Sequence, residues 1–536
     1  MNDSQTSLER RVADLAAAGA SATLAGNRIG LEKEGLRVTP AARLADSPHP
    51  PALGSALTHP YITTDFSESL IELVTPALTG AQEVLDFLTD IHRYVYRHLG
   101  NEWLWATSMP CVLERAGQIP LARYGASNAA TMKTAYRRGL GNRYGRTMQM
   151  IAGVHFNFSF ADAFWTLYQE QTGTPGEARA FRDAAQMGMI RNLQRIGWIL
   201  PYLFGASPAV CASFVQGRAT DLQHFDASTL FYPYATSLRM GDIGYQNKQE
   251  EGVGIKANYD SLDAYVRSLT WAIQTPCPRY EAIGVKVGDR YEQLNANVLQ
   301  IENEYYSTVR PKQITDWLEK PSLALRRRGI AYVELRSLDV NLFEPVGVGI
   351  EQLLFLEVLM LDCLLRDSPR IGTRERRDID ENQVLAAHRG REPGLRLARD
   401  HTELELRQWA HELLDGMVAT AALLDGVADG PRAANLRVQM EKIAHPDLTP
   451  SAQMLQRMRE RGEGFFAFAQ HLSEAHGRAL RSSTLSAERL ASFDRLAAES
   501  VQRQREIEAS DDRSFDDFLR DYFAQGKAGN PSEPRV

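Results

Sequence analysis

Three stretches of the chain alternate between apolar and polar residues, which is the pattern of strands that bury one face. They cover residues 28–38, 153–160 and 330–337, and residues 295–304 are also predicted to form a strand. A parallel sheet that is buried on both faces would instead give continuous apolar runs. We therefore predict an antiparallel or mixed β-sheet whose polar face lines a cleft.

Helices are predicted where apolar residues recur every three or four positions. Such stripes begin at Leu8 and cover residues 81–99. The long apolar run 349–365 contains three acids, which would be costly in lipid, so it is predicted to be a buried helix rather than a membrane span. Together with the strands, these stripes predict the α+β class, with helices around the sheet.

The hydrophobic pattern of the sequence changes near residue 370, beyond which strand patterns are rare. We expect an α+β domain over residues 1–369, a largely helical C-terminal region over residues 370–526, and a disordered tail over residues 527–536. The last helix is expected to begin at Ser514, because Asp517 follows three residues later in a capping-box-like arrangement.

The composition indicates a soluble protein. Of its 536 residues, 44% are hydrophobic and 24% charged, and the net charge of -7 disfavours nucleic acid or an anionic membrane as the main partner. The four cysteines are far apart in the sequence, which favours reduced thiols. The first residues lack the basic start and apolar core of an export signal, so we expect a cytoplasmic protein.

Glu32 and Glu34 are the first candidates for chemistry. In an extended segment they share one face, while Lys33 lies on the other. Carboxylates in a folded interior repel one another unless a cation or a proton offsets the repulsion, so a metal site is one explanation. A solvated strand edge is the alternative, and it is the commoner origin of this pattern taken alone.

A second group of acids comprises Asp65, Glu68 and Glu72. All three fit one face of a helix, whereas Glu68 and Glu72 also fit one face of a strand. The pattern leaves both geometries open, and either one groups the carboxylates.

Further polar candidates lie on the predicted strands and in loops. His155 and Glu334 occupy the polar faces of two strands, Arg336 shares the face of Glu334, and Arg239 lies in a loop with aromatic residues. A lone strand histidine is more often structural than a ligand, but two nearby acid groups favour a ligand. Residues 122–145, rich in Arg, Lys and Tyr, form either a solvated basic face or a positive wall for phosphates and carboxylates.

Missing motifs narrow the choice of function. The sequence contains no P-loop, no glycine-rich dinucleotide motif, no H-E-x-x-H and no G-x-S-x-G. Carboxylates with one imidazole suit Mg²⁺ or Mn²⁺ better than Zn²⁺, and more than three carboxylates indicate more than one ion. Several cations facing arginines are what ATP requires for phosphoryl transfer.

Several motifs occur in an order that also carries a family resemblance. They are GLEKEGLRV at residues 30–38, ITTDFSE at 62–68, PYLFGASP at 201–208, YATSLR at 234–239 and YVELRSLD at 332–339, with further matches at 391–395 and 446–449. In these motifs the chain resembles the bacterial, single-chain type of glutamate–cysteine ligase. Lys33 and Gly35 depart from the Arg and Thr expected of that family, on the strand face away from Glu32 and Glu34.

The resemblance implies a glutamine-synthetase-like fold, in which the concave face of a curved antiparallel sheet binds more than one Mg²⁺, ATP, glutamate and cysteine. The metal ligands that it implies are Glu32, Glu34, Asp65, Glu72, His155 and Glu334. It also implies that Arg239 and Arg336 are catalytic arginines facing the phosphates or the glutamate. The remaining substrate-binding residues that it implies are Tyr136, Arg137, Tyr245 and Tyr306, of which the last two would close over cysteine.

The implied reaction is ATP- and Mg²⁺-dependent synthesis of γ-glutamylcysteine, the first step of glutathione biosynthesis. The γ-carboxylate of L-glutamate would take the γ-phosphoryl group, and the amine of L-cysteine would displace phosphate. We expect a monomer, with feedback inhibition by glutathione. The alternatives are a related carboxylate–amine ligase with another amine acceptor and a non-catalytic nucleotide- or amino-acid-binding protein. The many acids argue against the latter, because they would repel an anionic ligand unless metals were present.

Overall fold

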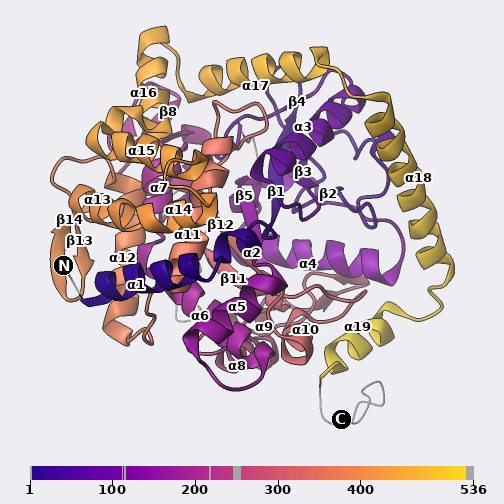
Figure 1. Cartoon of the computed structure of the whole chain (residues 1–536). Helices are drawn as coiled ribbons and strands as arrows, with labels where there is room; N and C mark the ends of the chain where they lie inside the picture. Colours follow the sequence, from indigo (N-terminus) through magenta and orange to yellow (C-terminus); the bar gives the residue numbers. More distant parts are fainter. Residues whose placement is uncertain (1–2, 112, 114–115, 216–218, 245–254, 527–536) are drawn as a thin grey trace.

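An antiparallel sheet forms the centre of the molecule. The computed structural model describes residues 3–111, 113, 116–215, 219–244 and 255–526 (Figure 1). The seven strands follow the order β11-β12-β5-β1-β3-β2, with β4 beside β1, and every pair is antiparallel. These strands are β1 (Arg28–Val38), β2 (Ile62–Thr64), β3 (Leu70–Val74), β4 (Trp103–Leu104), β5 (Val154–Ser159), β11 (Val309–Lys312) and β12 (Tyr332–Leu338).

The strand register aligns polar residues that are far apart in the sequence. Glu32 lies opposite His155, and Glu34 lies opposite Glu72. Glu334 lies opposite Asn157 on one side and Arg310 on the other. Directly opposed residues in an antiparallel pair place their side chains on the same face, so the acids of β1, β3 and β12 share one side of the sheet with His155 of β5.

Helices and the apolar strand positions form the main core. Leu31, Phe156 and Val333 are fully buried, as the alternating pattern predicts. Helix α3 packs against β1 and β3, α6 against β11, and α7 against β12, while α11 packs on α3 and α6. The bounds of these helices are α3 (Ala81–His98), α6 (Ala178–Ile196), α7 (Ile199–Phe204) and α11 (Ile350–Leu365).

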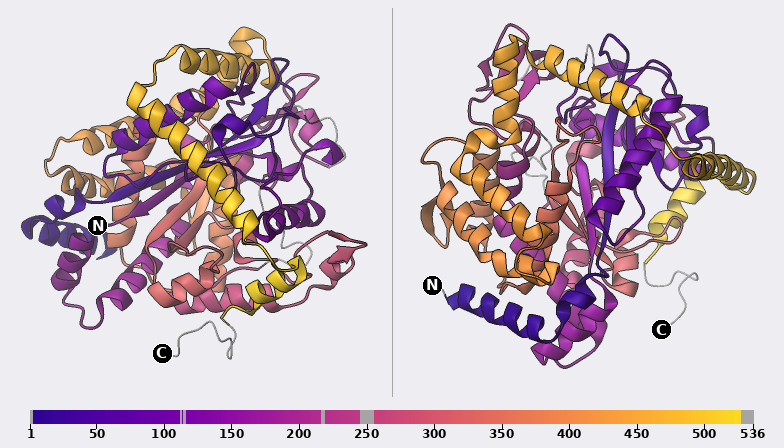
Figure 2. Two further views of the ribbon diagram at one scale, coloured as in Figure 1. Left: turned by 90° about the vertical axis from the view of Figure 1, so that its right-hand side faces the viewer. Right: turned by 45° about the horizontal axis from the view of Figure 1, so that its top comes forward.

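The part of the chain after α11 is largely helical, and its helices gather on the side away from β2 before α17 and α18 return along the outer edge (Figures 1 and 2). They are α12 (Thr373–Arg389), α13 (Leu406–Gly416), α14 (Val418–Asp425), α15 (Pro431–Ala444), α16 (Pro450–Arg461), α17 (Phe465–Ser482), α18 (Ala487–Ala509) and α19 (Phe515–Ala524). The hydroxyl of Ser514 accepts a hydrogen bond from the Asp517 amide, which confirms the predicted start of the last helix. Among the described helices, none is long and apolar enough to cross a membrane.

The remaining helices and strands complete the fold, and they include α4 on the side of the sheet that carries the acids. The helices are α1 (Asp3–Ala17), α2 (Ala20–Leu24), α4 (Asn128–Tyr144), α5 (Asp162–Thr172), α8 (Leu262–Gln274), α9 (Pro278–Glu281) and α10 (Pro321–Arg328). The strands are β6 (Ala209–Cys211), β7 (Gln223–His224), β8 (Thr229–Phe231), β9 (Lys286–Val287), β10 (Arg290–Tyr291), β13 (Arg396–Arg399) and β14 (Thr402–Glu405). All four cysteines are buried thiols.

The strand predicted for residues 295–304 is wrong. This segment is a loop that ends in a 3₁₀ turn, Glu302–Glu304. Polar side chains bond the loop backbone locally, since Gln300 accepts from the Leu294 amide and Asn295 donates to the Gln300 carbonyl. These local bonds take the place of a sheet ladder.

Candidate active site

A cavity of about 680 Å³ lies between the polar face of the sheet, helix α4 and the loops around residues 298–321. Its lining brings together every predicted site residue that the structure describes. These residues are Glu32, Glu34, Asp65, Glu72, Tyr136, Arg137, His155, Arg239, Tyr306, Glu334 and Arg336. Tyr245 lies outside the described residues.

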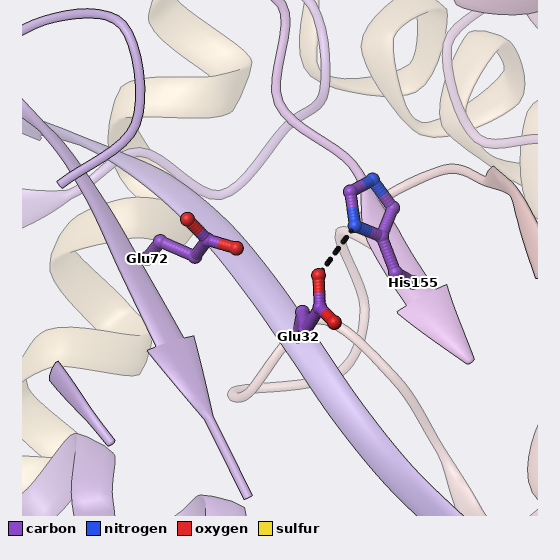
Figure 3. A group of neighbouring side chains, drawn as sticks. All are labelled: Glu32, Glu72 and His155. Atoms are coloured by element: carbon purple, nitrogen blue, oxygen red, sulfur yellow. Dashed lines mark hydrogen bonds and ion pairs between the residues drawn. The ribbon is translucent and has the colours of Figure 1, made fainter. Parts of the chain in front are cut away.

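The carboxylates of Glu32 and Glu72 and the imidazole of His155 form the tightest group of potential ligands. One donor atom from each lies within 4.8 Å of the others, and all three side chains point into the same space (Figure 3). His155 Nδ1 lies 2.9 Å from Glu32 Oε2, and the Asn157 amide donates to the other oxygen of Glu32. Strand pairing therefore brings residues that are far apart in the sequence into one compact site.

The structure settles the geometry that the second acid group left open. Glu72 lies on strand β3, while Asp65 lies in the turn after β2. The Tyr124 hydroxyl donates to the Asp65 carbonyl, and Arg137 Nη2 lies 3.8 Å from Asp65 Oδ1. Glu68 is turned elsewhere, because its carboxylate accepts from backbone amides outside the cavity.

Glu334 is buried beside two cations. Arg336 Nη1 donates to Glu334 Oε1 at 3.0 Å, and Lys312 Nζ lies 3.6 Å from the same oxygen. The second oxygen, Oε2, is buried without a hydrogen-bond partner among the described residues. A buried carboxylate oxygen of this kind is expected to receive a ligand that the chain does not provide.

Burial and mutual repulsion shape the electrostatics of the acids. Burial raises the pKa of Glu72 well above its usual value, and the carboxylates of Glu32, Asp65 and Glu34 add to the rise. Burial also raises the pKa of Glu34. The pKa of Glu334 falls instead, because Lys312 and Arg336 outweigh the effect of its burial. No hydrogen bond or ion pair from the described residues reaches the Glu72 carboxylate.

These observations fit divalent cations. Hard oxygen ligands with one imidazole match Mg²⁺ or Mn²⁺. A cation beside Glu72 would offset the burial and the repulsion from neighbouring carboxylates that disfavour its ionised form. The group of Glu32, Glu72 and His155 has the spacing of ligands around one ion. Glu34, Asp65 and the unpartnered oxygen of Glu334 line the same cavity and could serve another.

Arg239 and Tyr306 lie together on another side of the cavity. The Tyr306 hydroxyl and Arg239 Nη1 both contact the Met240 sulfur, at 3.9 and 3.2 Å. Arg239 Nη2 donates to the Arg336 carbonyl at 2.8 Å. The two arginines predicted to act on substrates are therefore adjacent.

The wall opposite the sheet contains residues that the site prediction missed. Lys133 and Met132 of α4 line it with the predicted Tyr136 and Arg137, and Tyr522 of α19 completes it. Lys312 joins from β11 on the sheet side. The density of Arg, Lys and Tyr in residues 122–145 was a signal for the α4 wall. Nothing in the local sequence of α19 predicts that Tyr522 lines the cavity, because the helical periodicity indicates only that this side chain faces a core.

Comparisons with known proteins agree with this architecture. A sequence model of the glutamate-cysteine ligase family matches residues 12–385. Glutamate–cysteine ligases from Alcanivorax borkumensis and Pseudomonas aeruginosa are 47% and 46% identical to the chain, and each alignment covers 96% of this chain and 99% or 98% of the relative.

Solved structures show the same relationship. A glutamate–cysteine ligase from Francisella tularensis, in complex with AMP, superposes with a TM-score of 0.87 at 34% identity, covering 93% of this chain and 97% of that one. A bifunctional glutathione synthetase from Pasteurella multocida shares the fold, with a TM-score of 0.71 at 23% identity over 90% of this chain and 57% of that one. The chain belongs to the glutamate–cysteine ligase family.

Proposed function

We infer that this chain is a glutamate–cysteine ligase that couples ATP cleavage to the formation of γ-glutamylcysteine, the first step of glutathione synthesis. Family membership supports the reaction, and the AMP complex of the Francisella tularensis enzyme supports the use of ATP. The observation that carries the assignment to this cavity is the meeting of Glu32, Glu72 and His155 with Arg336 and Lys312 in one enclosed space.

The arrangement of the acids supports a set of metal ligands. We propose that Glu32, Glu72 and His155 hold one divalent cation, and that Glu34, Asp65 and Glu334 contribute to at least one more. Such ions, when bound, would neutralise phosphate charge and stabilise the charge that develops during phosphoryl transfer. His155 keeps its orientation through Glu32, whose other oxygen is fixed by Asn157.

The basic residues would bind the anionic groups of the substrates. Arg336 and Lys312 present charged donors from the sheet, Arg239 presents one from the turn Leu238–Met240, and Arg137 presents one from α4. Charge-assisted hydrogen bonds from such donors orient carboxylates and phosphates. Tyr136 and Tyr306 add aromatic surface, which suits the cysteine side chain.

The chemistry then requires positioning rather than a covalent enzyme nucleophile. An oxygen of the glutamate γ-carboxylate attacks the γ-phosphorus of ATP, and ADP leaves. The cysteine amine next attacks the acyl carbon of the γ-glutamyl phosphate, phosphate leaves, and the amine loses a proton. A cavity that holds all three reactants close together lowers the barrier to both steps.

The test is a coupled assay of phosphate release. Purified protein with ATP, Mg²⁺, L-glutamate and L-cysteine should release phosphate and form the dipeptide, and phosphate release should fall to background when either amino acid is omitted. A panel of other amines should give lower kcat/KM values than cysteine. Phosphate release that ignores cysteine, or a higher kcat/KM for another amine, would overturn the assignment.

Three narrower features are proposed on the family resemblance and composition alone. They are a monomeric state, cytoplasmic location and inhibition by glutathione. Size-exclusion chromatography and an assay with added glutathione would check the first and the last.

A further inference from the structure

Three of the sequence motifs meet at a buried aspartate that does not line the cavity. Asp339 follows strand β12, and its side chain is fully enclosed. Its Oδ2 accepts from the Ala206 amide at 2.9 Å and from the Ser207 hydroxyl at 2.6 Å. Its Oδ1 accepts from the Ser237 hydroxyl at 2.9 Å. The motifs at residues 201–208, 234–239 and 332–339 are thus joined by one carboxylate.

An ion pair connects this carboxylate to Arg239, which lines the cavity. Asp339 Oδ1 lies 3.8 Å from Arg239 Nη1, and no other cation of the described residues is within ion-pair distance of Asp339. Burial raises the pKa of Asp339, while Arg239 and the hydroxyl donors oppose the rise. A buried carboxylate without such partners would be strongly unfavourable. Asp339 and Arg239 therefore stabilise one another.

The guanidinium of Arg239 has little freedom. Nη2 donates to the Arg336 carbonyl at 2.8 Å. A Cβ atom added to Gly153 would clash with Nη2, so the backbone at this glycine closely abuts the arginine. The end of β12, through Asp339 and the Arg336 carbonyl, and Gly153 before β5 therefore restrict the guanidinium.

The backbone that carries Arg239 is held by the same serines. Ser237 accepts a hydrogen bond from the Met240 amide, which caps the 3₁₀ turn Leu238–Met240. The amides of Thr236 and Ser237 donate to the Ala387 carbonyl of α12, at 2.8 and 3.1 Å. Both the turn and the side chain of Arg239 are thus fixed from outside the cavity.

We propose that Asp339, together with Ser207 and Ser237, is a positioning group that holds Arg239 in the orientation needed to bind substrate. Asp339 touches no substrate and acts only through Arg239. The proposal rests on the function proposed above, in which Arg239 contacts an anionic group of a substrate. It gives a role to motif residues that the metal and substrate sites leave unexplained.

A double-mutant cycle tests this role. Asp339→Asn keeps the size and an acceptor oxygen but removes the charge that faces Arg239, so kcat/KM should fall on the order of 100-fold, the scale of a misplaced catalytic contact. In an Arg239→Ala background the same change should lower kcat/KM by less than about twofold further, because the residue that Asp339 positions is gone. Circular dichroism and the thermal midpoint show whether each variant is folded.

Two further variants keep the test decisive if Asp339→Asn unfolds. Ser237→Ala and Ser207→Ala each remove one hydrogen bond to Asp339 and leave its charge in place, and each should give a smaller loss that also disappears in the Arg239→Ala background. Gly153→Ala should crowd Nη2 of the guanidinium and reduce kcat/KM without altering Asp339. Glu357→Gln is the matched control, because it changes a buried carboxylate outside the cavity and should leave kcat/KM unchanged.

The outcomes separate this inference from the proposed function. Losses that vanish in the Arg239→Ala background support the positioning role. Equal losses with and without Arg239 overturn it and assign Asp339 a purely structural part, while Arg239 keeps its role. If Arg239→Ala itself leaves kcat/KM unchanged, the substrate role of Arg239 and the positioning role both fail.

Discussion

Two groups of acids in this chain differ in the hydrogen bonds and ion pairs that their carboxylates receive from the chain. Between helices α11, α14 and α15, Arg432 donates to both oxygens of Glu357, at 2.9 and 3.2 Å. The same arginine lies 3.1 Å from Asp425, which also accepts from two backbone amides at the start of α15. Burial raises the pKa of Glu357, and Arg432 opposes that rise. Every carboxylate of this helical cluster is satisfied by the chain itself.

The acids of the cavity are satisfied only in part. Half-buried Glu72 receives no hydrogen bond or ion pair from the described residues, and one buried oxygen of Glu334 has no partner there. Burial of unsatisfied charge lowers stability, so such a group is expected to be completed from outside the chain. The helical cluster serves stability, whereas the cavity retains acids at some cost in stability, as is expected if cations and substrates complete them.

The largest effect is expected for Glu334→Gln. The change removes a charge that faces Arg336 and Lys312 and weakens a proposed metal ligand, so kcat/KM should fall on the order of 1,000-fold. The dipeptide-forming assay measures this loss, and circular dichroism checks the fold. Activity within a few-fold of the wild type would remove Glu334 from the metal set.

Arg432→Met should break the helical cluster without altering catalysis. It leaves two buried carboxylates without their shared cation, and the free energy of unfolding should fall by about 3 kcal/mol. Urea denaturation measures the loss. The folded variant should keep the wild-type kcat/KM, and a large fall in kcat/KM would show that the two acid groups are not independent.

Glu72→Gln should have the opposite sign in metal-free protein. Burial and neighbouring carboxylates raise the pKa of Glu72, so its ionised form opposes folding at neutral pH. Removing that charge should stabilise the metal-free protein by about 1 kcal/mol, the size of one screened repulsion between nearby charges. Added Mg²⁺ should raise the thermal midpoint of the wild type more than that of the variant. A lower midpoint for the metal-free variant would contradict the contrast between the clusters.

The smallest effect is expected for Asp425→Asn. An asparagine oxygen can still accept the backbone amides at the start of α15, so the cap remains. The free energy of unfolding should fall by less than about 1 kcal/mol, well below the loss from Arg432→Met. A loss equal to that of Arg432→Met would mean that the charge of Asp425, rather than its capping bonds, dominates this site.

The alternating pattern was sufficient to predict β1, β5 and β12 and the face on which Glu32, His155 and Glu334 lie. It predicted these elements because burial of one face leaves a period of two in the sequence. The buried helix α11 was equally clear, since its apolar run is long and its acids exclude a membrane span. The family resemblance, rather than periodicity, supplied the substrates and most residue roles.

Other features depend on contacts that no local pattern encodes. The pairing of Glu32 with His155 spans 123 residues and requires the strand register. Residues 295–304 look extended, yet side-chain bonds of Gln300 and Asn295 fold them into a loop. Tyr522 reaches the cavity only because α19 packs on α4. Long-range packing therefore decided the parts that sequence reasoning missed or left open.

Counting bound Mn²⁺ by electron paramagnetic resonance would show directly whether the cavity acids serve cations. We expect more than one ion per chain in the wild type, fewer in Glu72→Gln, and the wild-type number in Glu357→Gln, whose carboxylate lies in the helical cluster. Equal numbers in the wild type and Glu72→Gln, or no bound ion in either, would contradict the assignment of the cavity as a multi-metal site.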